Sequence, residues 1–245
     1  MTMINDAAWW RVLAGAPTDE WIDPLASVVF SPEATGAADQ EHECVVVRLQ
    51  YASGAVLEAT ISCPGPGMLR LTAGDRSHEV DLHDDALPLS VRETPSGLVV
   101  TGPEVIGRLG PGGMITEHLS RPGSAPLAVA DAEALPIADL AAGTGRLMHG
   151  ATQIGWVETV TLAPDCALYG SGESFSDLNL RGRRRTLVNR ETHTAAGRDL
   201  AYLNVPFFWS DEGWGLLVNS GGPVGCDAGA SQRESMALVV EGPTL

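Results

Sequence analysis

The chain has 245 residues, 44% of them hydrophobic, 28 glycines and a formal net charge of −16. This length accommodates one large domain or two small ones, but not a (β/α)8 barrel of about 250 residues together with a second domain. The hydrophobic content excludes a disordered chain, and the acidic charge argues against nucleic acids and anionic membranes as partners.

Cysteine and histidine positions give no sign of a metal or redox centre. The cysteines, at 44, 63, 166 and 226, lie far apart without a C-x-x-C pair, so they are predicted to be small buried residues with reduced thiols. No H-x-H or H-E-x-x-H spacing occurs, and we expect no metal and no cofactor. The N-terminus lacks the basic and apolar regions of a signal peptide, and no apolar run approaches the roughly 18 residues of a membrane helix. We therefore expect a cytoplasmic protein.

The expected secondary structure is one helix followed by strands. Near the N-terminus, Asn5 or Asp6 can cap a short helix that Gly15 and Pro17 end. The pattern then changes to short β-rich runs separated by glycine and proline turns. These predicted strands cover residues 44–50, 55–61, 68–73, 87–92, 98–101 and 104–109. Many short strands with frequent turns are typical of a β-sandwich or barrel.

The second half of the chain begins with a region that has no clear pattern. Residues 110–150 are interpreted as an irregular connection, and their glycine cluster is not a phosphate loop because no Gly-Lys-Ser/Thr follows. Strands resume at residues 156–162, 205–210, 214–220 and 236–241. Gly213 suits a hairpin position with positive φ between the second and third of these. Pro206 is predicted to start a strand whose aromatic residues pack in the core.

A series of motifs between Ala167 and Gly229 is the most specific part of the sequence. In chain order it contains Tyr169-Gly170-Ser171-Gly172-Glu173, Arg181–Arg185, Asn189-Arg190-Glu191, Tyr202-Leu203-Asn204-Val205-Pro206-Phe207, Gly213-Trp214-Gly215, Val218-Asn219 and Cys226-Asp227-Ala228-Gly229. The series resembles the end of the N-terminal β-sandwich of family 31 glycoside hydrolases, the retaining α-glucosidases and α-xylosidases. The resemblance implies one all-β domain over residues 1–245, a galactose-mutarotase-like antiparallel β-supersandwich with a short N-terminal helix.

Five residues depart from the family pattern, two of them, Glu191 for aspartate and Trp214 for tyrosine, by exchange for a similar residue. Ser171 replaces an apolar residue between the two glycines, Ser174 replaces an arginine after the glutamate, and Val188 replaces an aromatic residue before the asparagine. The change at Ser174 leaves the family's salt bridge at this point without its arginine. The two glycines are still expected to let the backbone approach another chain segment closely.

The resemblance also implies a loop that contacts substrate. In the family, the loop that begins at the motif of Asn189 reaches from the sandwich into the mouth of the barrel's active site. Glu191 falls on the family's aspartate, and His193 falls on a polar residue two positions later. These two are the candidate substrate-binding residues. Ordinary solvated loop residues are the other interpretation.

No catalytic residue is expected in this chain. Retaining glycosidases use two carboxylates about 5 to 5.5 Å apart, which in the family are barrel aspartates, and no stretch here resembles their motifs. The implied partners are a catalytic barrel, expected beyond Leu245, and its α-linked sugar substrate. A sandwich face left uncovered without the barrel is expected to allow self-association.

Two alternatives from other functional classes remain open. A free-standing carbohydrate-binding module would present an exposed groove lined by aromatic residues. An aldose epimerase on the same fold would need an acid–base pair in a concave cleft, and His193 with Glu191 or Glu173 is the only nearby combination.

Overall fold

The computed structural model describes residues 20–38, 40–74, 86–95, 97–110, 113–118, 127–128, 145–173, 177–189, 201 and 203–242. The regular structure of these residues is strand except for one helix of four residues, α2 (Pro32–Thr35). Neighbouring strands in every sheet run antiparallel, so the all-β antiparallel prediction is confirmed. The expected helix near the N-terminus lies outside the described residues.

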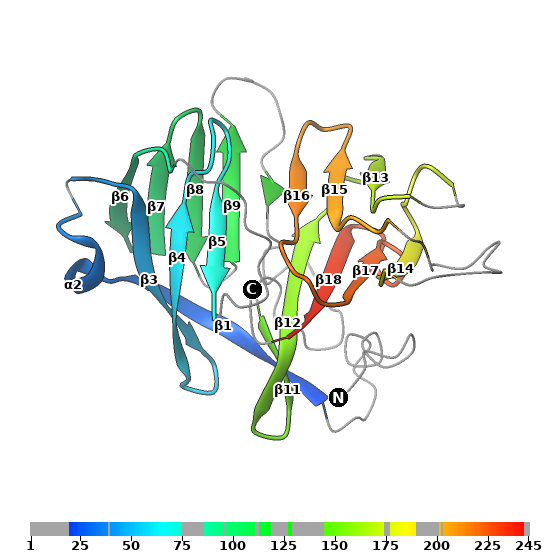
Figure 1. Cartoon of the computed structure of the whole chain (residues 1–245), viewed down its shortest axis with the longest axis horizontal. Helices are drawn as coiled ribbons and strands as arrows, with labels where there is room; N and C mark the ends of the chain where they lie inside the picture. The colour runs from blue at the N-terminus through cyan, green and yellow to red at the C-terminus, as the bar shows by residue number, and fades with distance from the viewer. Residues whose placement is uncertain are drawn as a thin grey trace.

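The largest sheet has nine strands and contains both the first and the last strand of the described chain. Its strands, in spatial order, are β14 (Arg183–Leu187), β17 (Val224–Ala228), β18 (Ser235–Glu241), β12 (Thr152–Thr161), β11 (Gly145–His149), β1 (Glu20–Phe30), β3 (Cys44–Tyr51), β4 (Val56–Ser62) and β5 (Arg70–Ala73). β1 pairs with β11 along its first half and with β3 along its second half. This long strand therefore joins the two halves of the sheet (Figure 1).

Two smaller sheets accompany the two halves of the large one. The six-stranded sheet has the order β10 (Leu127–Ala128), β9 (Gly113–His118), β8 (Val105–Gly110), β7 (Gly97–Gly102), β6 (Leu89–Thr94) and β2 (Glu41–His42). The three-stranded sheet has the order β13 (Leu168–Gly170), β15 (Phe207–Ser210) and β16 (Gly215–Leu217). The six-stranded sheet lies with β3, β4 and β5, whereas the three-stranded sheet lies with β12, β17 and β18 (Figure 1).

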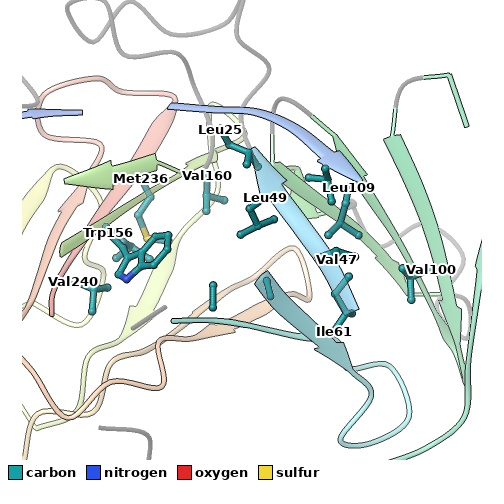
Figure 2. Packing of buried hydrophobic residues seen from close by; sticks show 14 of the residues in the cluster. Leu25, Val47, Leu49, Ile61, Val100, Leu109, Trp156, Val160, Met236 and Val240 are labelled. Carbon is teal, nitrogen blue, oxygen red and sulfur yellow. The ribbon is translucent and has the colours of Figure 1, made fainter. Parts of the chain in front are cut away.

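One hydrophobic core cluster contains residues from all three sheets. In β3, Val45, Val47 and Leu49 alternate with less buried residues, as expected for a strand with one face on the core. In β18, by contrast, the residues from Ser235 to Val240 are all buried. Trp156, which is fully buried, packs in this cluster near Met236 and Val240 (Figure 2).

The predicted strands of the first half are confirmed, within a few residues at their ends. Gly213 has a φ of 91° in the turn between β15 and β16, which confirms its predicted hairpin position. The interpretation of residues 110–150 as an irregular connection was wrong for β9, β10 and β11. β1 was missed because Pro24, which has no N–H to donate, normally argues against a strand interior. Here Pro24 lies close to the position where β1 exchanges one partner strand for the other.

Two burial predictions need correction. Cys44 is exposed, whereas the other three cysteines are buried as predicted. The aromatic residues after Pro206 were expected in the core, but only Phe208 is there, and Phe207 and Trp209 are exposed. The reason is geometric, because successive side chains of a strand point to opposite faces of the sheet.

Candidate functional site

The structure describes the base of the predicted substrate loop. Glu191 and His193 themselves lie outside the described residues, within the segment 190–200. Asn189 precedes this segment, and Ala201 follows it. The two form an isolated parallel bridge, so the ends of the segment are adjacent.

Two asparagine side chains hold the ends of this segment together. The side-chain oxygen of Asn189 accepts a hydrogen bond of 2.7 Å from the backbone N–H of Asn204. In return, the side-chain amide of Asn204 donates to the carbonyls of Val188 at 2.9 Å and Ala201 at 3.1 Å. An amide side chain suits this role because it offers both an acceptor and two donors. We call the Asn189–Asn204 pair the loop neck.

The glycine motif fixes the position of the segment before β15, which carries Asn204. The backbone N–H of Ser171 donates to Phe207 at 2.9 Å, and that of Glu173 donates to Leu203 at 2.8 Å. The motif therefore pairs with the chain on both sides of Asn204. The loop neck is supported by this second segment in addition to its own side chains.

Glycine is required at both motif positions because the two backbones are in contact. A Cβ atom at Gly170 would lie 2.1 Å from the carbonyl oxygen of Phe207, and one at Gly172 would lie 2.2 Å from that of Leu203. Both glycines also have positive φ, 109° and 83°. The predicted close approach of the backbone is confirmed. Ser171 between them has a φ of 68°, an uncommon conformation for a residue with a side chain.

The last motif is structural, because Asp227 organises the turn that follows β17. Its carboxylate accepts hydrogen bonds from the backbone N–H groups of Ala230 and Ser231, and from the Ser231 hydroxyl at 2.6 Å. Arg184 donates to the same carboxylate at 2.8 Å. Asp227 is 3% exposed, so its oxygens face these partners and not solvent. We therefore assign Asp227 a structural role at the β14 edge of the large sheet, and not a role in substrate binding.

The buried thiols are not poised for nucleophilic chemistry. Burial raises the pKa of Cys63, of Cys166 and of Cys226, so all three are protonated at neutral pH. Among the described residues, no group of three or more His, Cys, Asp or Glu side chains is arranged to hold a metal ion. No helix within these residues is long and apolar enough to cross a membrane.

The sandwich and its motif series define a class of domain, and the comparison with known families names it. Residues 58–227, more than half of the chain, match the glycosyl hydrolase 31 N-terminal galactose mutarotase-like domain. The chain belongs to this family. The glycine motif and the loop neck both lie within the matched residues.

Curated relatives match a short part of the chain. It is 33% identical to an alpha-xylosidase of Emericella nidulans over 78 residues, which are 32% of this chain and 10% of the relative. It is 28% identical to the alpha-xylosidase XylQ of Lactiplantibacillus pentosus over 88 residues, 36% of this chain and 11% of the relative. The matches thus span about a tenth of these enzymes.

Solved structures resemble nearly the whole chain at low identity. The cycloalternan-forming enzyme from Listeria monocytogenes superposes with a TM-score of 0.66 and 18% identity, over 91% of this chain and 20% of the enzyme. A GH31 alpha-xylosidase from a soil metagenome superposes with a TM-score of 0.55 and 16% identity, over 82% of this chain and 30% of the enzyme. These similarities show the fold. The larger part of each enzyme has no counterpart here, and the described residues contain no (β/α)8 barrel.

The structure predicts how the loop neck responds to an isosteric change. Asn204→Asp keeps the side-chain shape but removes the N–H donors that serve Val188 and Ala201. The carbonyls of Val188, which is half-buried, and of Ala201, which is buried, would then face a carboxylate, so we expect the free energy of unfolding to fall by about 2 kcal/mol. Chemical denaturation measures this loss. Asn179→Asp is the matched control, because Asn179 is exposed and its side-chain oxygen accepts from two backbone N–H groups. An equal loss in both variants would contradict the donor role of Asn204.

Proposed function

We propose that this chain is the non-catalytic N-terminal domain of a retaining α-glycosidase. In this proposal the sandwich supports the catalytic barrel, and the segment 190–200 extends to the substrate. The observation that carries it is the loop neck, in which Asn189 and Asn204 bind each other and the ends of that segment. A segment held at both ends by hydrogen bonds can present its side chains in a reproducible position.

Glu191 is the proposed principal contact to the sugar. Its carboxylate is a charged acceptor, the group that forms the stronger hydrogen bonds with hydroxyl donors. His193 is the proposed second contact, through a ring nitrogen or by stacking on the sugar. The two curated relatives are alpha-xylosidases, which supports an α-linked sugar as the substrate class. A cytoplasmic location and hydrolase activity of the parent protein belong to the same proposal.

The proposal predicts a kinetic effect without a structural one. A hydrogen bond to a charged acceptor contributes about 1.5–3 kcal/mol, so Glu191→Ala in the full-length protein should lower kcat/KM by about 10- to 150-fold. The melting temperature should hardly change, because an exposed loop substitution usually stays within about 0.5 kcal/mol. Glu191→Gln is the matched control. It keeps a neutral acceptor of nearly the same length and should lose less activity.

Kinetics and melting temperature must be measured on the same preparations. Unchanged kinetics in Glu191→Ala would return this residue to the solvated-loop interpretation. A large drop in melting temperature with little change in kcat/KM would make it a structural residue. His193→Ala gives the weaker test, since stacking and hydrogen bonding differ in their sensitivity to truncation.

A further inference from the structure

A row of exposed apolar side chains runs along β15 of the three-stranded sheet and the segment that precedes this strand. Leu203, Val205, Phe207 and Trp209 occupy every second position and are 41% to 60% exposed. Between them, Asn204 and Phe208 are buried, Phe208 completely, and Pro206 is half-buried. The strand therefore has large apolar side chains on both faces. That pattern is typical of a strand covered on both sides, not of one that faces water.

The apolar surface extends beyond this row onto both neighbouring strands. Leu217 of β16 lies opposite Phe207, and it is also exposed. Tyr169 of β13 lies opposite Trp209, and the two rings stack with their centroids 4.4 Å apart. Five of the nine exposed large hydrophobic side chains in the described part of the chain belong to this one sheet and the segment that leads into it. We call residues 169, 203, 205, 207, 209 and 217 the outer patch.

The outer patch is continuous with the loop neck. Leu203 and Val205 are the two residues on either side of Asn204, whose side chain closes the neck. Their exposed side chains therefore begin where the segment 190–200 ends. A catalytic domain that receives this segment at its active site would therefore lie next to the outer patch as well.

We infer that the outer patch is the surface on which the catalytic barrel docks. This inference rests on the proposed function and names the face that serves it. The similar solved enzymes have 70 to 80% of their length outside the part matched by this chain, which is ample polypeptide to cover such a face. A second copy of this chain is a poorer occupant, because two bodies of net charge −16 repel each other. The aliphatic members, Leu203, Val205 and Leu217, favour a protein surface over a sugar, which stacks on aromatic rings.

Hydroxyl-radical footprinting tests the inference on individual side chains. The full-length protein and the isolated chain are oxidised in parallel, and modification of Trp209 is quantified by mass spectrometry. Trp21 is the matched control, since it is 42% exposed against 43% for Trp209 and lies on β1 in a different sheet. We expect oxidation of Trp209 to fall about fivefold in the full-length protein, as for a side chain taken into the core of an interface. Trp21 should react equally in both.

Each other outcome contradicts the inference in a different way. Equal oxidation of Trp209 in both proteins, beside an active barrel, overturns the docking surface and leaves the proposed function standing. Protection in the isolated chain that rises with its concentration assigns the outer patch to a second copy. Protection that appears only with added malto-oligosaccharide assigns it to sugar. A full-length protein without a barrel overturns the proposed function and this inference together.

Discussion

Asp23→Ala is expected to lower the free energy of unfolding by about 3–5 kcal/mol, the usual cost of removing one partner of a buried ion pair. The side chain of Asp23 is 1% exposed and forms an ion pair with Arg146, which is 10% exposed. Ser53 donates to the same carboxylate from its backbone N–H at 2.9 Å and from its hydroxyl at 2.6 Å. Without Asp23, the guanidinium of Arg146 would remain buried without its counter-charge.

The position of this ion pair explains why its loss should affect the whole fold. Asp23 and Arg146 are opposite each other on β1 and β11, and the guanidinium lies 4.5 Å from the centroid of the Tyr51 ring on β3. The pair thus connects three adjacent strands where β1 passes from one half of the large sheet to the other. Chemical denaturation of the isolated chain measures the effect.

A double variant separates the effect of an unpaired buried charge from the effect of lost side-chain volume. Asp23→Ala/Arg146→Met removes both charges, so it should be less destabilised than Asp23→Ala alone. The matched control is Asp177→Ala. Asp177 pairs with Arg183, but these side chains are 68% and 49% exposed, and such surface pairs contribute at most about 1 kcal/mol. If the double variant is less stable than Asp23→Ala, the unpaired charge of Arg146 is not the cause of the lost stability.

The same pair predicts a pH dependence with a definite sign. Burial acts to raise the pKa of Asp23, but hydrogen bonds from Ser53 and Arg146 outweigh it and hold the pKa below its usual value of 3.8. A lowered pKa in the folded state means that the stabilisation is present above this value and is lost as the pH falls further. The stability difference between wild type and Asp23→Ala should therefore be constant near neutral pH and shrink below about pH 4.

Local sequence patterns were sufficient to predict most strands. They were not sufficient for strands that contain an unfavourable residue and form because neighbouring strands pair with them. The runs that became β3, β4, β7 and β8 alternate or are bounded by turns, and both signals are local. β1 contains Pro24, and β11 is a short strand with glycine at its start, so neither has a strong local signal. They form strands because they pair with each other from distant parts of the sequence, and also with β3 and β12.

The motif series predicted where to look for a site but not how its base is built. It predicted a substrate loop after Asn189, and the structure shows that the ends of the segment 190–200 are adjacent. The role of Asn204 was missed, because a motif that reads as strand and core gives no hint that one amide serves two carbonyls across the loop. Exposure of Phe207 and Trp209 was also missed. The sequence of a strand with aromatic residues on both faces does not reveal whether the second face is covered by another part of the same chain.

The second large effect is expected at the glycine motif. Gly172→Ala would place a Cβ atom 2.2 Å from the carbonyl oxygen of Leu203 and 2.5 Å from the nitrogen of Val205, both of them backbone atoms. Neither can move without shifting the backbone around it, so the two segments must separate. The φ of 83° adds a cost of about 1–2 kcal/mol for any residue with a side chain. Together with about 1–3 kcal/mol for the overlap, we expect a loss of about 2–5 kcal/mol in the free energy of unfolding.

Gly182→Ala separates the steric cost from the conformational one. Gly182 has a φ of 75°, close to that of Gly172, but nothing lies within 4 Å of a Cβ atom built there. It should therefore lose only about 1–2 kcal/mol. Because the displaced segment carries Asn204, Gly172→Ala should also disturb the loop neck. In the full-length protein it should lower kcat/KM at temperatures where both variants remain folded, whereas Gly182→Ala should not. Equal stability losses in the two variants would show that the close approach of the two backbones does not contribute to the cost. Glycine would then be needed at position 172 only for its positive φ.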